Sequence, residues 1–560
     1  PAQRAQPPRS TPPATPSLTT AAPLPVTANG ARLMAGQPIP TGELEAFVDG
    51  VMQEAMTREH IAGATVAIVQ NGQVVLKKGY GFASLSPARR VDPDRTLFRL
   101  GSISKTFTWI GVMREVEAGR IELNAPVNRF LPEPVQIRDQ GYSNPVRVRH
   151  LMSHSAGFED RALGHLMERS ADRERPLLAY LRQERPRRVS GAGMVSTYSN
   201  YGAALAGQAV SYVADKTFER QMEETLFLPL GMRNTSFREP TGGRKGLPGP
   251  MPDRLAANLA TGYRWTPEGF EARPFEFIGH AAPAGSASST AADMARYMQM
   301  LLNGGTLEGR TIYGPRTAQA FRTRLRNTPE GVNGWRHGFM EYDLPGGVDG
   351  FGHAGATLSF MSNMVIAPSL NLGIFVSTNT ESGWDLQSRL PAAVIRQFYA
   401  PPASPRLGDP ALVGRAGDYE GYYLGTRRAY GGLEGFVGRL TAGSDVRVTS
   451  RGVLTTTHGG ETRSWVQDGA SNGHRFVSTT GEEHIAFQVA DGAAASYLPA
   501  MGGVLYERAP FWSRPTLLAV LSAMTGAAAV ATLAGLAMRN RREFRQTSIQ
   551  RLASLLQNTE

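Results

Sequence analysis

The 560-residue sequence contains no cysteine. This absence excludes disulfide bonds, a thiol nucleophile and cysteine-ligated metal sites. Lysine is scarce as well, because only five of the 59 lysine and arginine residues are lysine. Arginine therefore carries most of the net charge of +11, and the sequence has no lysine-rich run and no basic segment interleaved with aromatic residues. Since such segments are the footprint of nucleic-acid binding, we expect no nucleic-acid partner.

The scarcity of lysine makes each remaining lysine informative. The five are Lys77, Lys78, Lys105, Lys216 and Lys245. Arginine keeps its proton in proteins, whereas a buried lysine can lose its proton and act as a base. Lys105 is the only one of the five with a serine, Ser102, three residues before it. On a helix this spacing places the amine and the hydroxyl one turn apart on the same face, so Lys105 could activate Ser102 as a nucleophile.

An apolar segment lies near the C-terminus. Leu517–Met538 comprises 22 uncharged and largely apolar residues, and about 20 are enough to span a bilayer. The arginines that follow directly are Arg539, Arg541, Arg542 and Arg545. By the positive-inside rule, the basic and amphipathic tail over 539–560 faces the cytoplasm. We therefore predict a transmembrane helix over 516–538 in the cell membrane, with the preceding chain extracytoplasmic (periplasmic).

Composition divides the rest of the chain into three parts. Residues 1–41 are rich in proline and poor in periodic apolar residues, which predicts a disordered leader. Residues 42–400 have the patterns of a globular domain, and a proline-rich linker follows at 401–405. Short alternating segments between turn-forming residues predict a small all-β domain over 406–510. The chain is thus expected to fold into two domains ahead of its membrane segment.

The larger domain mixes helical and hairpin patterns. Two β-rich runs flank Asn71 and Gly72, a strong hairpin signal because both turn positions favour positive φ. A second hairpin is expected over 358–377, and helices are expected over 102–119 and 291–302. There is no βαβ repeat in the sequence. These patterns predict an α+β fold in which helices flank an antiparallel sheet.

Two serine motifs compete for the role of nucleophile. Gly469–Gly473 has the pattern G-x-S-x-G, which works only at a strand-to-helix turn above a parallel sheet. It lies between two predicted strands of the all-β domain, so we interpret it as a turn. Ser102 has better companions, because Tyr198-Ser199-Asn200 and His353-Ala354-Gly355 follow it along the chain. The three elements have the patterns S-x-x-K, Y-x-N and H-x-G.

In this order and at these separations, the three elements resemble those of class C β-lactamases and penicillin-binding-protein-like serine hydrolases, the S12 peptidase family. Other phrases that match are Phe98–Gly101, His150–Gly157, Pro229–Met232 and Gly352–Ala356. The resemblance covers about residues 42–400. It implies a β-lactamase/DD-peptidase-like sheet with flanking helices and an all-α lobe. The β-rich domain and the membrane segment behind it resemble the arrangement of membrane-attached members.

The resemblance also implies roles for individual residues. Ser102 is expected to be the acylated nucleophile and Lys105 its base partner. Tyr198 is expected to carry the proton to the leaving group, as base in one half-reaction and acid in the other. Asn200 is expected to donate to the substrate carbonyl and to hold Lys105. The chemistry implied is hydrolysis of an ester, amide or peptide bond through an acyl-enzyme.

The third element is expected to border the substrate. His353 stands on a strand where many relatives have lysine, and Gly355 follows two residues later. The backbone N–H groups of Ser102 and Ala356 are expected to form the oxyanion hole, and one such donor contributes ~3–4 kcal/mol in the transition state. β-Lactamases and DD-carboxypeptidases usually have threonine or serine where this chain has Ala354, and that hydroxyl helps to hold the substrate carboxylate. We therefore expect weak β-lactamase activity and a substrate held by other contacts.

Several functions remain open at this level. An esterase, a D-aminopeptidase, a cell-wall carboxypeptidase and a β-lactamase would share these motifs, and their substrates are small esters, peptides or muropeptides. A sensor of β-lactams or muropeptides would acylate Ser102 without turnover, but the presence of Tyr198 and the short tail favour an enzyme. His150 and His154 are four residues apart without an evident third ligand, so we expect no metal and no other cofactor. The sequence predicts no oligomeric state.

Overall fold

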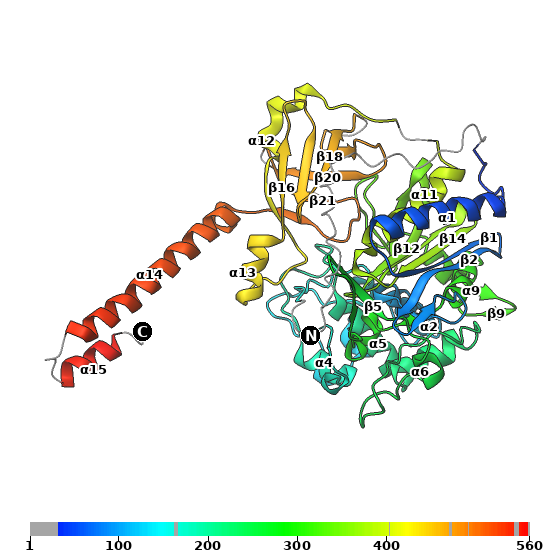
Figure 1. The fold of residues 1–560 in the computed structure, drawn as a ribbon, viewed down its shortest axis with the longest axis horizontal. Helices are drawn as coiled ribbons and strands as arrows, with labels where there is room; N and C mark the ends of the chain where they lie inside the picture. The colour runs from blue at the N-terminus through cyan, green and yellow to red at the C-terminus, as the bar shows by residue number, and fades with distance from the viewer. Residues whose placement is uncertain are drawn as a thin grey trace, which may run out of the picture.

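The structure is a computed structural model. It describes residues 32–161, 166–401, 404–469, 473–490, 492–542 and 548–557. Most of the predicted leader over 1–41 lies outside the described residues, as do the centres of the predicted linker at 401–405 and of the Gly469–Gly473 motif. Figure 1 shows a larger domain of helices and strands, a smaller barrel beside it, and a long C-terminal helix that points away from both.

An antiparallel sheet of eight strands forms the centre of the larger domain, in the order β10-β11-β12-β13-β14-β1-β2-β3. The strands are β1 (Gly63–Gln70), β2 (Gln73–Leu85), β3 (Ala88–Arg90), β10 (Trp335–Arg336), β11 (Phe339–Leu344), β12 (Val348–Ala356), β13 (Met361–Ala367) and β14 (Leu372–Thr378). Both predicted hairpins are confirmed, as β1–β2 and β13–β14. Asn71 and Gly72 form the first turn with φ of 51° and 77°. Because β1 also pairs with β14, the two ends of this domain meet in one sheet.

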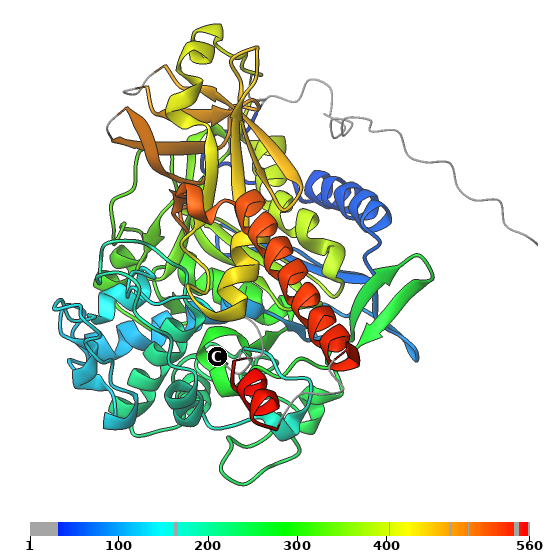
Figure 2. The same cartoon turned by 90° about the vertical axis from the view of Figure 1, so that its left-hand side faces the viewer.

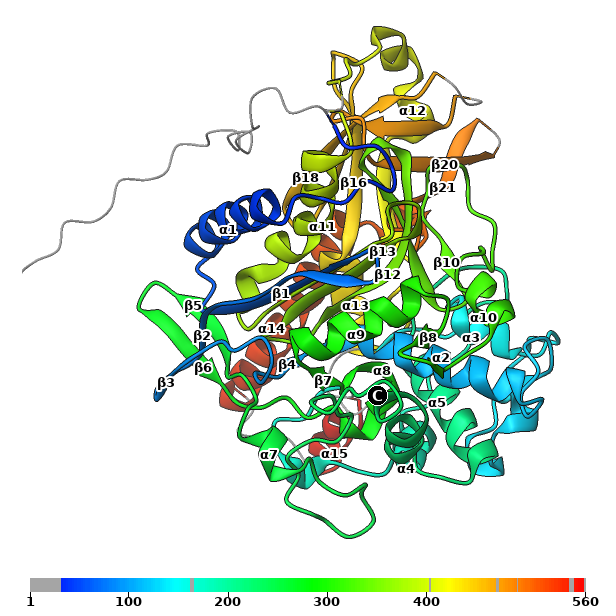
Figure 3. The same cartoon turned by 90° about the vertical axis from the view of Figure 1, so that its right-hand side faces the viewer.

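Helices cover both faces of the sheet (Figure 3). On one face lie α1 (Thr41–Arg58) and α11 (Trp384–Phe398). Their apolar side chains, among them Leu44 and Leu390, are fully buried in a core shared with β1, β13 and β14. Helix α9 (Ala291–Leu302) lies on the other face against β1 and β14, at the predicted position. The α+β fold class is therefore confirmed.

The all-α lobe is built around one buried helix. Its helices are α2 (Ser104–Glu117), α3 (Val148–Met152), α4 (Leu177–Gln183), α5 (Asn200–Ala214), α6 (Phe218–Met222) and α8 (Ala282–Gly285). Every side chain of α2 from Ser104 to Met113 is buried, and α5 and α8 pack against it. The helix predicted from residue 102 begins differently, since a 3₁₀ turn, η1 (Gly101–Ile103), precedes α2. The lobe thus holds the polar start of α2 away from bulk water.

The smaller domain is a closed antiparallel barrel of eight strands. They are β15 (Gly421–Gly425), β16 (Gly443–Val448), β17 (Leu454–His458), β18 (Glu461–Gln467), β19 (Arg475–Ser478), β20 (His484–Ala490), β21 (Ala493–Leu498) and β22 (Tyr506–Arg508). Aromatic side chains such as Tyr423, Trp465 and Phe487 fill its core. The prediction of an all-β domain missed the helix α13 (Gly432–Thr441) between β15 and β16. Three of its ten residues are glycine, a poor helix former, so local propensity did not signal it.

The barrel docks on the larger domain through backbone contacts. Thr197 and Val504 form an antiparallel bridge, and the backbone N–H of Tyr198 donates to the carbonyl of Gly503 at 3.3 Å. Asn333 N–H donates to the carbonyl of Ala500 at 3.1 Å. The connection between β21 and β22 therefore lies against the segment that precedes α5. This contact places the barrel beside the predicted proton carrier, Tyr198.

The C-terminal helices extend away from both domains (Figure 1), and Figure 2 shows them, in red, in front of the rest of the chain. Helix α14 (Pro515–Arg542) contacts α13 of the barrel near its start, and α15 (Ser548–Leu556) follows it. Within Pro515–Met538, a window of 18 residues has a mean hydropathy of 2.0, and none of it is buried. One helix of the described residues is therefore long and apolar enough to cross a membrane, in the position that the sequence predicted.

Gly502 is predicted to control the docking of the barrel. Its φ is +60°, and a Cβ added there would lie 1.5 Å from the carbonyl oxygen of Asn333. Gly502→Ala should therefore lower the free energy of unfolding by at least about 2 kcal/mol, measured by urea denaturation in detergent. Gly438→Ala is the matched control, because its Cβ meets nothing within 4 Å on α13 and should stabilise slightly. Equal stabilities of the Gly502→Ala variant and the wild type would contradict this docking.

Candidate active site

Ser102 lies in a tight turn between strand and helix. Strand β4 (Phe98–Arg99) leads into η1, and Ser102 is the second residue of that turn, directly before α2. Gly101 adopts φ of +51°, and a Cβ there would lie 2.7 Å from the backbone nitrogen of Ala356. A Cβ on Gly355 would lie 2.0 Å from the carbonyl oxygen of Leu100 and 2.9 Å from Ser102 N. Two glycines thus let β12 approach the turn and bring the backbone nitrogens of Ser102 and Ala356 close together.

The amine of Lys105 is surrounded by three oxygens. Nζ lies 2.9 Å from Ser102 Oγ and donates to Asn200 Oδ1 at 2.8 Å and to the carbonyl of Ala284 at 2.6 Å. The amide oxygen and the carbonyl can only accept, so they use two N–H groups. A neutral amine has two N–H groups and one lone pair. The arrangement therefore suits a neutral Lys105 whose lone pair faces the Ser102 hydroxyl.

Burial makes the neutral form favourable. The Lys105 side chain has 0% exposure, and loss of hydration lowers the pKa of its amine well below 10.5. The positive charge of Arg427 lowers this pKa further, and the negative charge of Asp160 opposes the shift. No carboxylate accepts a hydrogen bond from the amine among the described residues. The lowered pKa makes a neutral amine, which can accept a proton, more accessible for Lys105 than for an exposed lysine.

Tyr198 lies beside Ser102 and Lys105, and its hydroxyl is near that of Ser102. Lys105 Nζ lies 4.8 Å from the centroid of its ring, and the ring stacks on His154 at 4.3 Å. Burial raises the pKa of the phenol, and the nearby Ser102 hydroxyl opposes this shift. The hydroxyl is buried and lies close to the Ser102 hydroxyl. A neutral phenol at this position is ready to donate its proton to a group that enters the site.

Asn200 begins helix α5 at the edge of the site. The side chain of Ser199 caps the helix by accepting from the backbone N–H of Gly202 at 3.0 Å. This cap fixes the first turn, so the amide of Asn200 points back to Lys105. Because its oxygen accepts from Lys105, its nitrogen remains available to donate. The structure therefore brings together Ser102, Lys105, Tyr198 and Asn200, as the three motifs predicted.

His353 lies on β12 beside Tyr198, with 6.0 Å between the ring centroids. Its side chain is buried, and burial is the main cause that lowers its pKa to about 3. Nδ1 bonds to the carbonyl oxygen of Ala354, and Nε2 has no partner among the described residues. His353 is therefore neutral over the physiological range. It does not supply the positive charge that a lysine would bring to this edge.

The two histidines of the His150–Gly157 segment each bond to the backbone. His150 Nδ1 accepts from the backbone N–H of Arg147 at 3.1 Å, and His154 Nδ1 accepts from that of Ser199 at 3.1 Å. The described residues contain no group of three or more metal-ligating side chains. His154 instead packs against Tyr198 and against Trp335, 4.3 Å away between centroids. His154 thus packs against the ring of Tyr198. No motif in the sequence indicated this contact.

Arg427 is a site residue that the sequence did not indicate. It follows β15 in the barrel, far along the chain from the three motifs. Its guanidinium lies 4.7 Å from the Tyr198 ring centroid, and Nε donates to Asp160 Oδ2 at 2.7 Å. No motif spacing connects the two domains, so only the fold could reveal this neighbour.

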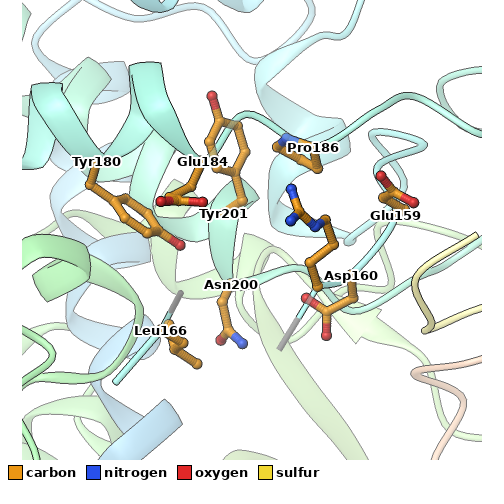
Figure 4. Close-up of a pocket in the computed structure, with 9 residues that line it drawn as sticks. Glu159, Asp160, Leu166, Tyr180, Glu184, Pro186, Asn200 and Tyr201 are labelled. Carbon is orange, nitrogen blue, oxygen red and sulfur yellow. The ribbon is translucent and has the colours of Figure 1, made fainter. Parts of the chain in front are cut away.

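A pocket opens beside Asn200 (Figure 4). It encloses about 360 Å³ of space that includes open solvent. Its lining residues are Glu159, Asp160, Arg161, Leu166, Tyr180, Glu184, Pro186, Asn200 and Tyr201. Arginines balance its three carboxylates, because Glu159 pairs with Arg187, Asp160 with Arg427 and Glu184 with Arg175. Only about 20 Å³ of this space can hold a water-sized group, so the pocket has room for little more than one water molecule.

This fold and this arrangement of side chains define a serine hydrolase of the β-lactamase and penicillin-binding-protein type. The chain belongs to the beta-lactamase family, whose model matches residues 48–397. Penicillin-binding protein 4 of Amycolatopsis lactamdurans is 27% identical over 394 residues, which cover 65% of this chain and 94% of that protein.

Two solved structures show the same fold. The octameric penicillin-binding protein homologue from Pyrococcus abyssi superposes with a TM-score of 0.52 at 21% identity, covering 84% of this chain and all of that chain. A class C beta-lactamase superposes with a TM-score of 0.53 at 20% identity, covering 66% of this chain and all of that chain. The predicted family resemblance is confirmed.

Gly355 is predicted to be essential for the shape of the site. In Gly355→Ala the new methyl group would press on Leu100 O and Ser102 N, and would push β12 away from the turn. We expect the rate of fluorophosphonate labelling to fall at least about 100-fold, as for the loss of an oxyanion donor. Gly50→Ala on α1, where a Cβ meets nothing within 4 Å, should label at the wild-type rate. Wild-type labelling of a folded Gly355→Ala variant would refute the close approach.

Proposed function

We propose that this protein is a membrane-anchored, extracytoplasmic serine hydrolase that cleaves an ester or amide bond through an acyl-enzyme on Ser102. The observation that carries the proposal is the buried Lys105 amine, 2.9 Å from Ser102 Oγ and fixed by two acceptors. A buried lysine without a carboxylate partner costs stability, since its charged form is poorly solvated. A catalytic role accounts for that cost.

In the acylation step, neutral Lys105 takes the Ser102 proton as Oγ attacks the carbonyl carbon. The negative charge that develops on the carbonyl oxygen is stabilised by the backbone N–H groups of Ser102 and Ala356. Tyr198 gives its proton to the leaving atom as the bond to that atom breaks. The proton on Lys105 then restores the phenol of Tyr198, which leaves the Ser102 ester with both partners neutral.

Deacylation uses the same groups in the opposite direction. Water enters where the leaving group departed, and Tyr198 takes its proton while passing its own proton to neutral Lys105, as the water oxygen attacks the ester. The carbonyl oxygen again lies at the N–H groups of Ser102 and Ala356. Collapse of the intermediate returns a proton to Ser102 Oγ. Asn200 holds Lys105 throughout and has a free N–H group with which to orient the substrate carbonyl.

A cell-wall carboxypeptidase or a penicillin-binding sensor is the second candidate. It is favoured by the match to Penicillin-binding protein 4 of Amycolatopsis lactamdurans, which extends over most of that protein. Neutral His353 and the methyl group of Ala354 cannot bind the carboxylate of a β-lactam as a lysine and a hydroxyl would. We therefore expect β-lactam hydrolysis to be inefficient. A fluorescent penicillin chase separates these cases. A label that stays on Ser102 would favour the sensor, and rapid release together with turnover of p-nitrophenyl esters would favour the hydrolase.

Substitutions at Ser102 and Lys105 test the mechanism. Ser102→Ala should abolish fluorophosphonate labelling, and Lys105→Arg should slow it at least about 100-fold, since arginine keeps its charge but cannot act as a base. In the wild type the labelling rate should rise as pH rises through the lowered pKa of Lys105, because only the neutral amine is active. Lys216→Arg is the control, since Lys216 is part of a surface ion pair with Glu224. Undiminished labelling in Lys105→Arg would exclude Lys105 as the base.

The membrane part of the proposal rests on α14. Phe511 and Trp512 are exposed just before this apolar helix, where aromatic residues commonly lie at the bilayer interface. The arginines after residue 538 favour a cytoplasmic end. The catalytic domain then lies on the outer side of the membrane, with the barrel nearest to the lipid.

The anchor can be tested by extraction of membranes. The full chain should stay with the membrane pellet in alkaline carbonate. Ala527→Arg, near the middle of the helix, should shift it toward the supernatant, since an arginine there costs about 3 kcal/mol. Ser513→Arg, just outside the apolar stretch, is the control and should not. Protease added to spheroplasts should degrade the catalytic domain, and complete protection of that domain in spheroplasts would contradict the proposed orientation.

A further inference from the structure

Arg427 reaches the active site from the barrel and is held there on both sides. The backbone N–H of Thr426 donates to Leu505 O at 2.8 Å, and its hydroxyl donates to Ser196 O at 3.4 Å. On the other side, Asp160 N–H donates to Arg428 O at 3.2 Å. The turn that carries Arg427 is therefore fixed to the larger domain and to the barrel. Its guanidinium has a defined position over the Tyr198 ring.

The guanidinium of Arg427 has N–H groups that are available to a ligand. Nε donates to Asp160, and in the described part of the chain the two terminal nitrogens make no hydrogen bond to protein. The side chain is 42% exposed, so solvent and substrate can reach those nitrogens. Two parallel N–H groups of a guanidinium match the two oxygens of a carboxylate, and hydrogen bonds between such charged groups are stronger than neutral ones. Asp160 orients the guanidinium through Nε and leaves the two terminal nitrogens of Arg427 available to a ligand.

The strand that carries His353 provides no comparable anion site. His353 is neutral, Ala354 has no hydroxyl, and the neutral Lys105 amine is already occupied by three oxygens. The positive charge that faces the catalytic ring is supplied by Arg427 instead. A substrate with a carboxylate near the bond to be cleaved would find its partner on the barrel.

We propose that Arg427 binds a carboxylate on the leaving group of the substrate, so that the barrel domain determines which substrates are cleaved. This inference rests on the proposed function, in which Tyr198 gives a proton to the leaving atom. A leaving group that touches the Tyr198 hydroxyl lies beside Arg427, which covers the same ring. The substrate class that fits is an ester, thioester or amide whose leaving alcohol, thiol or amine carries a carboxylate close to the leaving atom.

A pair of thioesters tests this inference. One is benzoylglycyl thioglycolate with a free carboxylate on the leaving group, and the other is its methyl ester, which lacks that charge. Because the chain has no cysteine, a disulfide reagent counts the released thiol without a protein background. In the wild type, kcat/KM for the acid should exceed that for the methyl ester by a factor on the order of 10 to 100.

Variants assign the preference to Arg427. Arg427→Gln should reduce the ratio of the two kcat/KM values to near one, and Arg427→Lys should restore part of it, since lysine keeps the charge but not the fork. Arg428→Gln is the matched control on the same turn. Arg428 bonds to backbone carbonyls within the barrel, so this variant should keep the wild-type ratio.

The outcomes separate the two levels of the proposal. A wild-type enzyme that is labelled at Ser102 and hydrolyses both thioesters equally would overturn the role of Arg427 and leave the serine hydrolase intact. An unchanged ratio in Arg427→Gln would do the same. A wild-type enzyme in which Ser102 reacts with neither thioester nor with fluorophosphonate would overturn the proposed function and the inference with it. If a variant fails to fold, the ratio of the two kcat/KM values in the wild type still tests the inference, because a ratio near one overturns it.

Discussion

The site depends on one constraint, the burial of a single amine. Lys105 comes from the first turn of α2, and its three oxygen partners come from the turn before α2, from the start of α5 and from α8. Each of these elements is packed against α2 in the lobe, so the position of the amine is determined by helix packing. Loss of water lowers the pKa of Lys105. In the proposed mechanism, this lowered pKa is what allows Lys105 to act as the base for Ser102.

The second domain completes this arrangement. The barrel is bound to the backbone around Tyr198, and it places Arg427 4.7 Å from the centroid of the Tyr198 ring, on which His154 also stacks. The positive charge of Arg427 also helps to keep Lys105 neutral. One residue of the barrel thus lowers the pKa of Lys105, lies over the Tyr198 ring and has two terminal nitrogens that we propose bind the substrate. This explains in physical terms why the barrel and the hydrolase domain contact each other at the active site.

The sequence predicted the parts of the structure that local patterns encode. Hairpins such as that at Asn71 and Gly72, the α+β class and the apolar C-terminal helix follow from periodicity and turn chemistry. The grouping of Ser102 with Tyr198 followed from family resemblance, and the structure places them side by side. Helix α13 was missed because it contains three glycines, which are poor helix formers, and because it is held by contacts with α14 and β16. Arg427 was missed because its role arises from contact between two domains, which no spacing along the chain records.

The most direct test of the neutral base is to titrate the lysines themselves. With five lysines in 560 residues, a protein labelled with ¹³C at lysine Cε gives few enough NMR signals to follow each one with pH. One signal, absent in Lys105→Arg, should titrate well below the ordinary lysine pKa of 10.5. Five signals that all titrate near 10.5 would show that Lys105 is protonated at neutral pH. That result would contradict the assignment of Lys105 as the base for Ser102.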